Sequence, residues 1–141
     1  MDLEKIRERL GAKEVWMNKS QAWWLETHKL DVEMMARLFI EIGARLVTIT
    51  ASRASEGEFH MIYHWDLQGQ LLNCVSITSQ ATLPSIISIC PAADWIERET
   101  HDYYAVTFTG RELPTLVLGG QDPPGIFSSI TPGKGKDGGR V

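Results

Sequence analysis

The sequence has little cysteine, no long apolar run and no excess of positive charge, and each absence excludes a class of protein. Cys74 and Cys90 are the only cysteines among 141 residues, without the close ligand pairs of zinc or iron–sulfur sites. No apolar run approaches the roughly 18 to 20 residues that span a bilayer. The formal net charge of −4 is not that of a nucleic-acid-binding protein. We therefore expect no nucleic-acid binding, no membrane span and two buried thiols.

The sequence also lacks the motifs of common catalytic, cofactor and metal sites. Gly133, Gly135 and Gly138 match Gly-x-Gly-x-x-Gly, but the strand, helix and acidic residue of a dinucleotide site do not accompany them. His60 and His64 would stand about 13 Å apart on a strand, too far to share one metal ion. No Gly-x-Ser-x-Gly nucleophile motif occurs. We expect no catalytic residue, no cofactor and no metal ligand in this chain.

Apolar residues at helical spacing predict three helices. The first covers residues 3–10, and Gly11 follows as its C-terminal cap. The second carries an apolar stripe over residues 34–42 and begins after Asp31, a good N-terminal cap. The third covers residues 92–104. The N-terminal segment is charged and lacks the apolar stretch of a signal peptide, so we expect a cytoplasmic protein.

Three segments, 45–50, 58–66 and 71–78, predict strands joined by turns. The middle one alternates, so that Tyr63 and Trp65 face one side of the sheet and His64 faces the other. One helix before three adjacent strands predicts an α+β fold with a mostly antiparallel sheet and helices on one face.

The remaining segments show no clear period. Residues 15–29 are expected to form a connecting segment that packs on another surface. Residues 121–141 are rich in proline and glycine and predict a loose tail after a single domain of residues 1–120. Five tryptophans either fill the core or anchor contacts with a partner, and we do not expect all five to be internal.

The third predicted helix concentrates charge. Its spacing lets Arg98 meet Asp102 and Glu97 meet His101. In one interpretation these are solvated surface pairs, each worth well under about 1 kcal/mol. In the other they form a charged cluster half buried against a partner, where removal of one charge would cost several kcal/mol.

At this helix the sequence resembles the 30 kDa subunit of complex I, which is the component designated C in bacterial NADH dehydrogenase. The resemblance rests on Ala93-Asp94-Trp95, Glu97-Arg98-Glu99-Thr100-His101-Asp102-Tyr103-Tyr104 and Val106-Thr107-Phe108-Thr109-Gly110, with similar segments at Tyr63-His64-Trp65-Asp66-Leu67 and Leu83-Pro84-Ser85-Ile86. Two departures stand out. Ala105 stands where the family usually has glycine, and Arg111 follows Gly110 where the family commonly has His-Pro.

The resemblance implies a two-layer α/β sandwich that docks on a large catalytic subunit and has no catalytic residue of its own. The compact form favours an accessory subunit of an energy-converting, membrane-bound [NiFe] hydrogenase, on the cytoplasmic face of the membrane. Its partners would be the large hydrogenase-like subunit and the small iron–sulfur subunit. The motif residues implied to fix local geometry or contact a partner are Trp95, Glu97, Arg98, Glu99, Asp102 and Tyr103.

Three alternatives remain open. The same fold also suits the equivalent subunit of a complex I-type NADH or ferredoxin:quinone oxidoreductase. A small independent enzyme would use His64, Asp66 or His101 around a pocket. A self-associating domain would pair its exposed tryptophans with those of a second copy.

Overall fold

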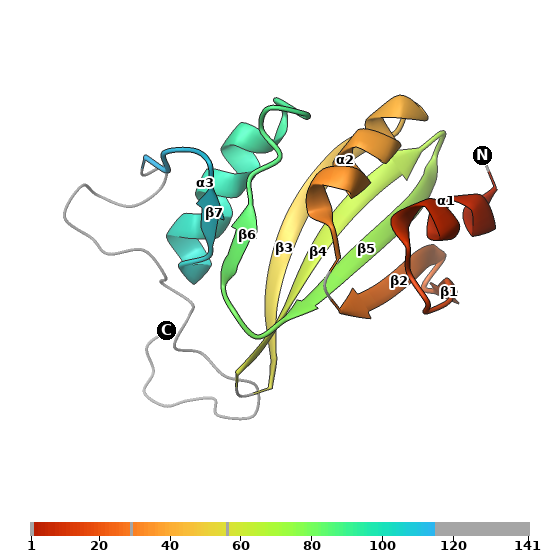
Figure 1. The fold of residues 1–141 in the computed structure, drawn as a ribbon, viewed down its shortest axis with the longest axis horizontal. Helices are drawn as coiled ribbons and strands as arrows, with labels where there is room; N and C mark the ends of the chain where they lie inside the picture. The colour runs from red at the N-terminus through yellow and green to blue at the C-terminus, as the bar shows by residue number, and fades with distance from the viewer. Residues whose placement is uncertain (1, 29, 56, 115–141) are drawn as a thin grey trace.

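The computed structural model describes residues 2–28, 30–55 and 57–114. Within these ranges the chain forms three helices and seven strands (Figure 1). Their order is α1 (Leu3–Leu10), β1 (Met17–Lys19), β2 (Ala22–His28), α2 (Val32–Glu41), β3 (Arg45–Ser55), β4 (Glu58–Leu67), β5 (Gln70–Thr78), β6 (Thr82–Pro84), α3 (Ala93–Tyr104) and β7 (Thr107–Thr109). The predicted tail, residues 121–141, lies outside the described residues.

Five strands form the main sheet in the order β1-β2-β5-β4-β3. The pairs β3–β4 and β4–β5 are antiparallel, which confirms the predicted meander. Strand β2 joins β5 in parallel, so the sheet is mixed at this point. Strands β6 and β7 pair in parallel with each other, outside the main sheet.

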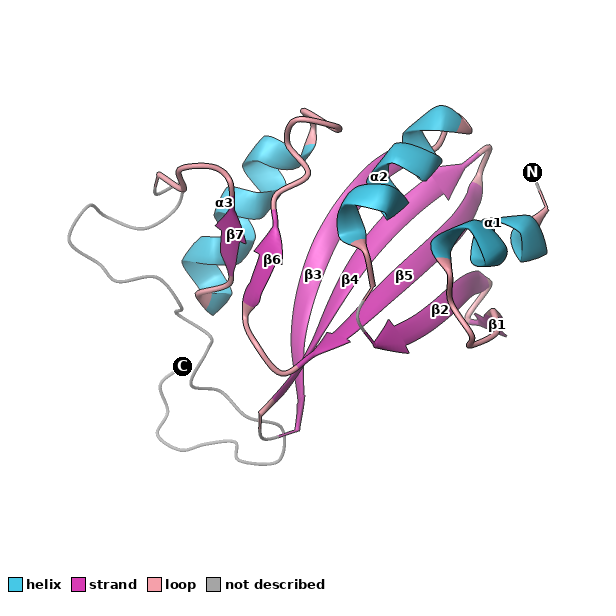
Figure 2. Ribbon diagram, in the orientation of Figure 1, coloured by secondary structure: helices cyan, strands magenta, loops and turns pink. Residues whose placement is uncertain are grey.

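Helices α1 and α2 lie against the same face of this sheet (Figure 2). Between α2 and the sheet, Phe39 stacks on Trp65 with ring centroids 5.0 Å apart and an interplanar angle of 8°. Both rings are fully buried, and Tyr63 lies buried in the same core. Burial of such large aromatic side chains is a major source of stability in a domain of this size. The α+β, two-layer architecture inferred from the sequence is confirmed.

The predicted caps form as expected. The Asp31 side chain accepts a 3.0 Å hydrogen bond from the Met34 backbone N–H at the start of α2. Gly11 ends α1 with φ at +71°, a conformation that suits glycine because it has no Cβ. Local sequence therefore determines where α2 begins and where α1 ends.

The prediction of a connecting segment over residues 15–29 was wrong. Residues 17–28 form the hairpin β1–β2, in which Met17 pairs with Trp24. The turn consists of Ser20 and Gln21, both with positive φ, at +52° and +63°. Hairpin turns of this kind usually contain asparagine or glycine, so these two residues do not signal a turn.

The apolar stretch after residue 82 was also misread in part. Strand β6 takes up its first residues, and α3 then connects β6 to β7. Cys74 and Cys90 are free and buried, as predicted. Of the five tryptophans, Trp16 and Trp65 are buried, while Trp95 is largely exposed. No helix in the described part of the chain is long and apolar enough to cross a membrane.

Candidate functional site

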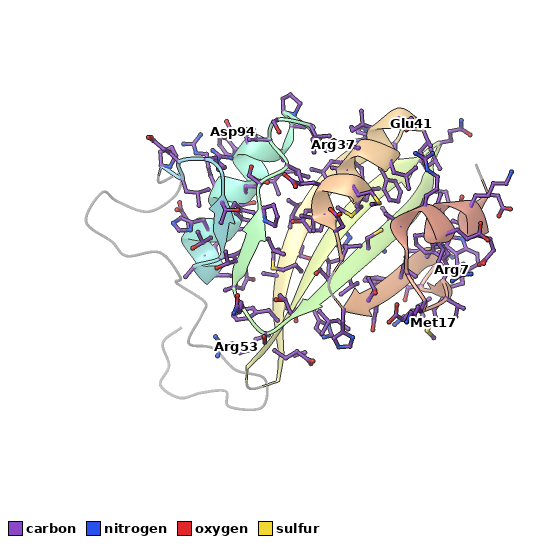
Figure 3. The ribbon with its side chains drawn as sticks, viewed as in Figure 1. Arg7, Met17, Arg37, Glu41, Arg53 and Asp94 are labelled. Carbon is purple, nitrogen blue, oxygen red and sulfur yellow. The ribbon has the colours of Figure 1, made fainter. Side chains whose placement is uncertain are left out.

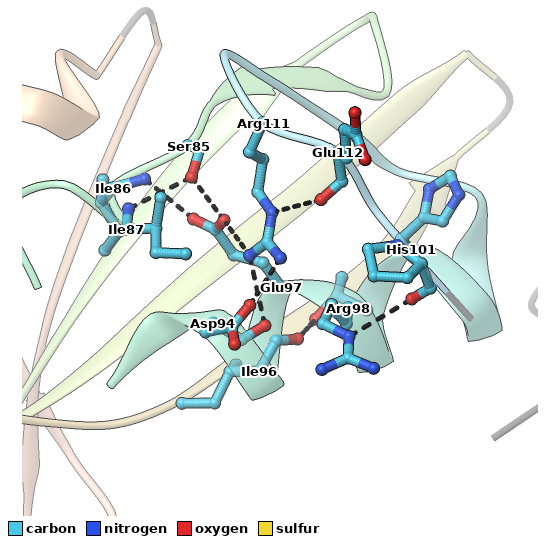
Figure 4. Close-up of polar contacts among 12 residues, drawn as sticks. Ser85, Ile86, Ile87, Asp94, Ile96, Glu97, Arg98, His101, Arg111 and Glu112 are labelled. Carbon is cyan, nitrogen blue, oxygen red and sulfur yellow. Dashed lines mark hydrogen bonds and ion pairs between the residues drawn. The ribbon is translucent and has the colours of Figure 1, made fainter. Parts of the chain in front are cut away.

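The charged helix α3 is held in place by a carboxylate at its centre. Glu97 is fully buried. Its Oε1 accepts a 2.6 Å hydrogen bond from the Ser85 hydroxyl, and its Oε2 accepts a 2.9 Å bond from the Ile86 backbone N–H (Figure 4). The Ser85 oxygen in turn accepts from the Ile87 N–H at 3.1 Å. Glu97 thus fastens α3 to the turn that follows β6.

Arg111 compensates the charge of this carboxylate. Its Nη1 lies 3.3 Å from Glu97 Oε1, and its Nη2 lies 2.5 Å from Asp94 Oδ1 (Figure 4). The Arg111 side chain is only 8% exposed, so both contacts are shielded from water. A buried carboxylate without a counter-charge would be very costly, and the guanidinium removes most of that cost. The chain after β7 is therefore fixed to the first turns of α3.

The predicted pair between Glu97 and His101 is wrong. Glu97 points to the turn at residues 85–86, while the His101 Nδ1 lies 2.9 Å from the Val106 carbonyl oxygen. The ring of His101 thereby stays near the C-terminal end of its own helix. Arg98 also has a partner outside the helix, because its Nε donates to the Pro114 carbonyl at 3.3 Å.

The six motif residues fall into two sets by exposure. Glu97 and Asp102 are fully buried. Trp95 is 61% exposed, and Arg98, Glu99 and Tyr103 are half-buried. Trp95, Arg98 and Glu99 are neighbours on one helix face by their spacing. We call Trp95, Arg98, Glu99 and Tyr103 the α3 surface.

The end of α3 is set by Ala105, which has φ at +58° and ψ at +28°. Its backbone N–H bonds to the His101 carbonyl at 2.9 Å. A left-handed conformation is strained for a residue with a Cβ, and a glycine relieves that strain. This position is the one where the family pattern has glycine.

The residues of the small-enzyme alternative do not meet in one site. His64 bonds to Thr50 and Asn73 within the sheet. Asp66 pairs with Arg45 at 3.0 Å, whereas His101 contacts the end of α3. Among the described residues, no group of three or more His, Cys, Asp or Glu side chains is placed to hold a metal ion.

Sequence reasoning missed Ser85, Asp94 and Arg111 as parts of the Glu97 network. Asp94 lies inside the recognised motif, but its partner Arg111 comes 17 residues later. Ser85 lies 12 residues before Glu97. These separations follow no helical or strand period, so only the fold brings the groups together.

Comparison with protein families agrees with the motif on α3. The model of the respiratory-chain NADH dehydrogenase 30 kDa subunit matches residues 25–124. The chain belongs to this family. The match begins within β2 and includes the meander β3–β5, the whole of α3 and Arg111.

Curated relatives in this family are the components designated C of NADH-quinone oxidoreductases. The one from Chelativorans sp. (strain BNC1) is 35% identical over 91 residues, which are 62% of this chain and 42% of the relative. The one from Methylobacterium sp. (strain 4-46) is 41% identical over 58 residues, which are 39% of this chain and 27% of the relative. This chain therefore spans less than half the length of the curated relatives that it matches.

Two solved structures share the fold. One comes from the membrane-bound sulfane sulfur reductase MBS, an archaeal respiratory membrane complex, with a TM-score of 0.66 and 23% identity over 86% of this chain and 76% of that one. The other is the trypsin-resistant fragment (1-134) of Nqo5, with a TM-score of 0.64 and 20% identity over 82% of this chain and 100% of that one.

Proposed function

We propose that this chain is a non-catalytic accessory subunit in the cytoplasmic arm of a membrane-bound respiratory or hydrogenase complex. Membership of the 30 kDa subunit family supports the proposal. Its role is to hold neighbouring subunits together, and other subunits transfer the electrons. The chain is peripheral, and its contacts with those subunits keep it at the cytoplasmic face of the membrane.

The exposed side chain of Trp95 is the observation that carries this proposal. It lies on the helix that bears the family motif and is 61% exposed. An indole ring is costly to leave in water, and tryptophan is enriched at the energetic centres of protein interfaces. The buried bonds of Glu97 hold the helix rigid, so little entropy is lost when a partner covers Trp95.

The two sets of motif residues then have separate roles. Glu97 and Asp102 fix the local geometry from inside the domain. The α3 surface contacts the neighbouring subunit: Trp95 supplies the apolar anchor, while Arg98 and Glu99 supply polar contacts around it. Such polar contacts contribute to specificity more than to affinity.

We further infer that the neighbour is the large, [NiFe]-hydrogenase-like subunit of an energy-converting hydrogenase, with a small iron–sulfur subunit in the same assembly. The fold also occurs in a sulfane sulfur reductase complex, so it is not confined to NADH-quinone oxidoreductases. This breadth is compatible with a hydrogenase. A second candidate is the equivalent subunit of a complex I-type NADH or ferredoxin:quinone oxidoreductase, which the description of the curated relatives favours.

The substitution Trp95→Ala tests the docking role. We expect the variant to fold normally, because the side chain is mostly in water, but to recover partner subunits more than tenfold less efficiently in affinity purification from solubilised membranes. Met34→Ala is the matched control, since Met34 is also an exposed apolar residue, on α2. Equal recovery of partner subunits with both variants would contradict docking through α3.

A further inference from the structure

A groove of about 340 Å³ lies at the opposite side of the main sheet from α3. Strand β1 forms one edge of this sheet and β3 the other, and α3 packs against β3. Figure 1 shows β1 and α3 at opposite ends of the molecule. We call this groove the β1 groove; its lining residues are Glu14, Val15, Met17, Lys19, Trp24 and Glu26.

The β1 groove opens on the sheet face that α1 and α2 leave uncovered. Trp24 and Glu26 alternate along β2 with Leu25, which is buried in the core under the helices. Met17 pairs with Trp24, so both belong to this uncovered face. All three residues of β1 are exposed.

The floor of the groove is apolar and open to solvent. Val15 is 61% exposed and Met17 is 55% exposed, and the half-buried Trp24 ring lies next to them. Large apolar side chains that cluster at an exposed edge are typical of contact sites. In Figure 3 the side chain of Met17 lies at the edge of the molecule, well away from Asp94 on α3.

The groove already accommodates one positive charge of its own chain. Lys19 Nζ lies 5.6 Å from the centre of the Trp24 ring and 3.9 Å from Glu26 Oε2. The Trp24 indole N–H donates to the Lys19 carbonyl at 3.3 Å, which holds the ring in position. The contacts of Lys19 show that a cation is stable over this ring and beside this carboxylate.

The charges in the groove do not balance. Glu14 and Glu26 face the single cation Lys19, so one negative charge remains in excess. A hydrogen bond from the Thr27 side chain lowers the pKa of Glu14, with a smaller contribution from backbone N–H groups, which keeps its carboxylate ionised near neutral pH. The combination of apolar floor and acidic rim is complementary to a basic side chain flanked by apolar ones.

We propose that the β1 groove binds an extended segment of a second partner protein that presents a lysine or arginine beside apolar residues. The basic group lies over Trp24 between the two carboxylates, and the neighbouring apolar side chains cover Val15 and Met17. Anionic lipid headgroups are a poor fit, because the acidic rim repels them. This contact is separate from the α3 surface, so the chain bridges two neighbours.

A peptide of alternating leucine and arginine, added to the full-length chain, tests the chemistry of the groove. Its binding is followed by NMR through the indole N–H signal of Trp24, assigned with Trp24→Phe. We expect this signal to shift saturably and the signal of Trp95 to stay unchanged. The same peptide with citrulline in place of arginine should bind at least fivefold more weakly, because citrulline has no charge.

Variants of the chain make the test specific to the groove. Glu14→Gln combined with Glu26→Gln should weaken peptide binding about fivefold, whereas Lys19→Gln should tighten it about threefold by removing the internal competitor. Glu8→Gln with Glu33→Gln is the matched control, since these exposed carboxylates lie on α1 and α2. The control should bind the peptide as the wild type does.

Three results would overturn the proposal. The first is no saturable shift of the Trp24 signal, and the second is equal binding of the arginine and citrulline peptides. The third is binding of the chain to phosphatidylglycerol vesicles without binding of the peptide. These measurements use the isolated chain, so they are independent of whether the Trp95 variant loses its partner subunits.

Discussion

The hydroxyl of Ser85 donates a 2.6 Å hydrogen bond to the fully buried carboxylate of Glu97. Through this bond and the one from the Ile86 N–H, α3 is fastened to the segment that precedes it in the chain. Arg111 adds the chain that follows. A single carboxylate therefore joins three segments that are distant in sequence, and its removal should affect the whole unit of β6, α3 and β7.

Replacement of Glu97 by alanine should destabilise the domain by about 3 kcal/mol. The change leaves Arg111 buried without one of its counter-charges and the Ser85 hydroxyl without its acceptor. Urea denaturation followed by tryptophan fluorescence measures this as a lower midpoint with an unchanged slope. Glu99→Ala on the same helix is the control and should change the free energy of unfolding by less than about 1 kcal/mol, since Glu99 is half-exposed.

A double-mutant cycle tests whether Glu97 and Arg111 act as a unit. We expect Arg111→Met to be destabilising alone, but much less so in a chain that already contains Glu97→Leu. The reason is that the second substitution then removes a charge that has lost its partner. Additive effects of the two substitutions would show that the 3.3 Å contact contributes little.

The substitution Ala105→Gly should stabilise the protein. Ala105 ends α3 with φ at +58°, where a Cβ is strained. Glycine relieves this strain, although its greater freedom in the unfolded chain offsets part of the gain. The expected net effect is up to about 1 kcal/mol, seen as a higher melting temperature. A lower melting temperature would mean that the Ala105 methyl group contributes more through packing than it costs in strain.

His64 should make stability depend on pH. Burial lowers the pKa of His64 below its ordinary value, against an opposing effect of its hydrogen bond to Asn73. The unfolded chain then takes up a proton at a pH where the folded chain does not, so stability falls as pH drops through about 6.5. NMR titration of the imidazole measures the pKa directly. His64→Gln should remove part of the acid sensitivity, and His28→Gln, at an exposed position, should not.

The two thiols should be unreactive in the native protein. Cys74 and Cys90 are buried, and burial raises the pKa of both, so little thiolate is present at pH ~8. A colorimetric disulfide reagent should label them no faster than the domain opens, and both should react at once in urea. Rapid labelling without denaturant would contradict the packing of the core.

Elements whose signals are local could be predicted from the sequence. Asp31 at the start of α2 and the alternation of Tyr63 and Trp65 with His64 in β4 each lie within one element, and both were read correctly. The β1–β2 hairpin was missed because Ser20 and Gln21 form its turn with positive φ. Those residue types rarely mark such a turn, and the hairpin is stable because β2 pairs with the distant β5.

The candidate site shows the same limit. The motif on α3 identified the right helix, but helical spacing could not distinguish Glu97, which is buried, from Glu99, which is half-exposed. That difference depends on Ser85 and Arg111, which reach Glu97 only through the pairing of β6 with β7. The burial of a charged residue is a property of the fold, and periodicity along one helix does not reveal it.

Membership of a membrane complex is best tested by purifying the tagged chain from gently solubilised membranes of its native host and identifying the proteins that accompany it. We expect stoichiometric recovery of other subunits of one membrane complex. A nickel–iron large subunit and a small iron–sulfur subunit would identify a hydrogenase, and quinone-reductase subunits would identify the alternative. Recovery of the chain alone, from the soluble fraction, would contradict its assignment as an accessory subunit.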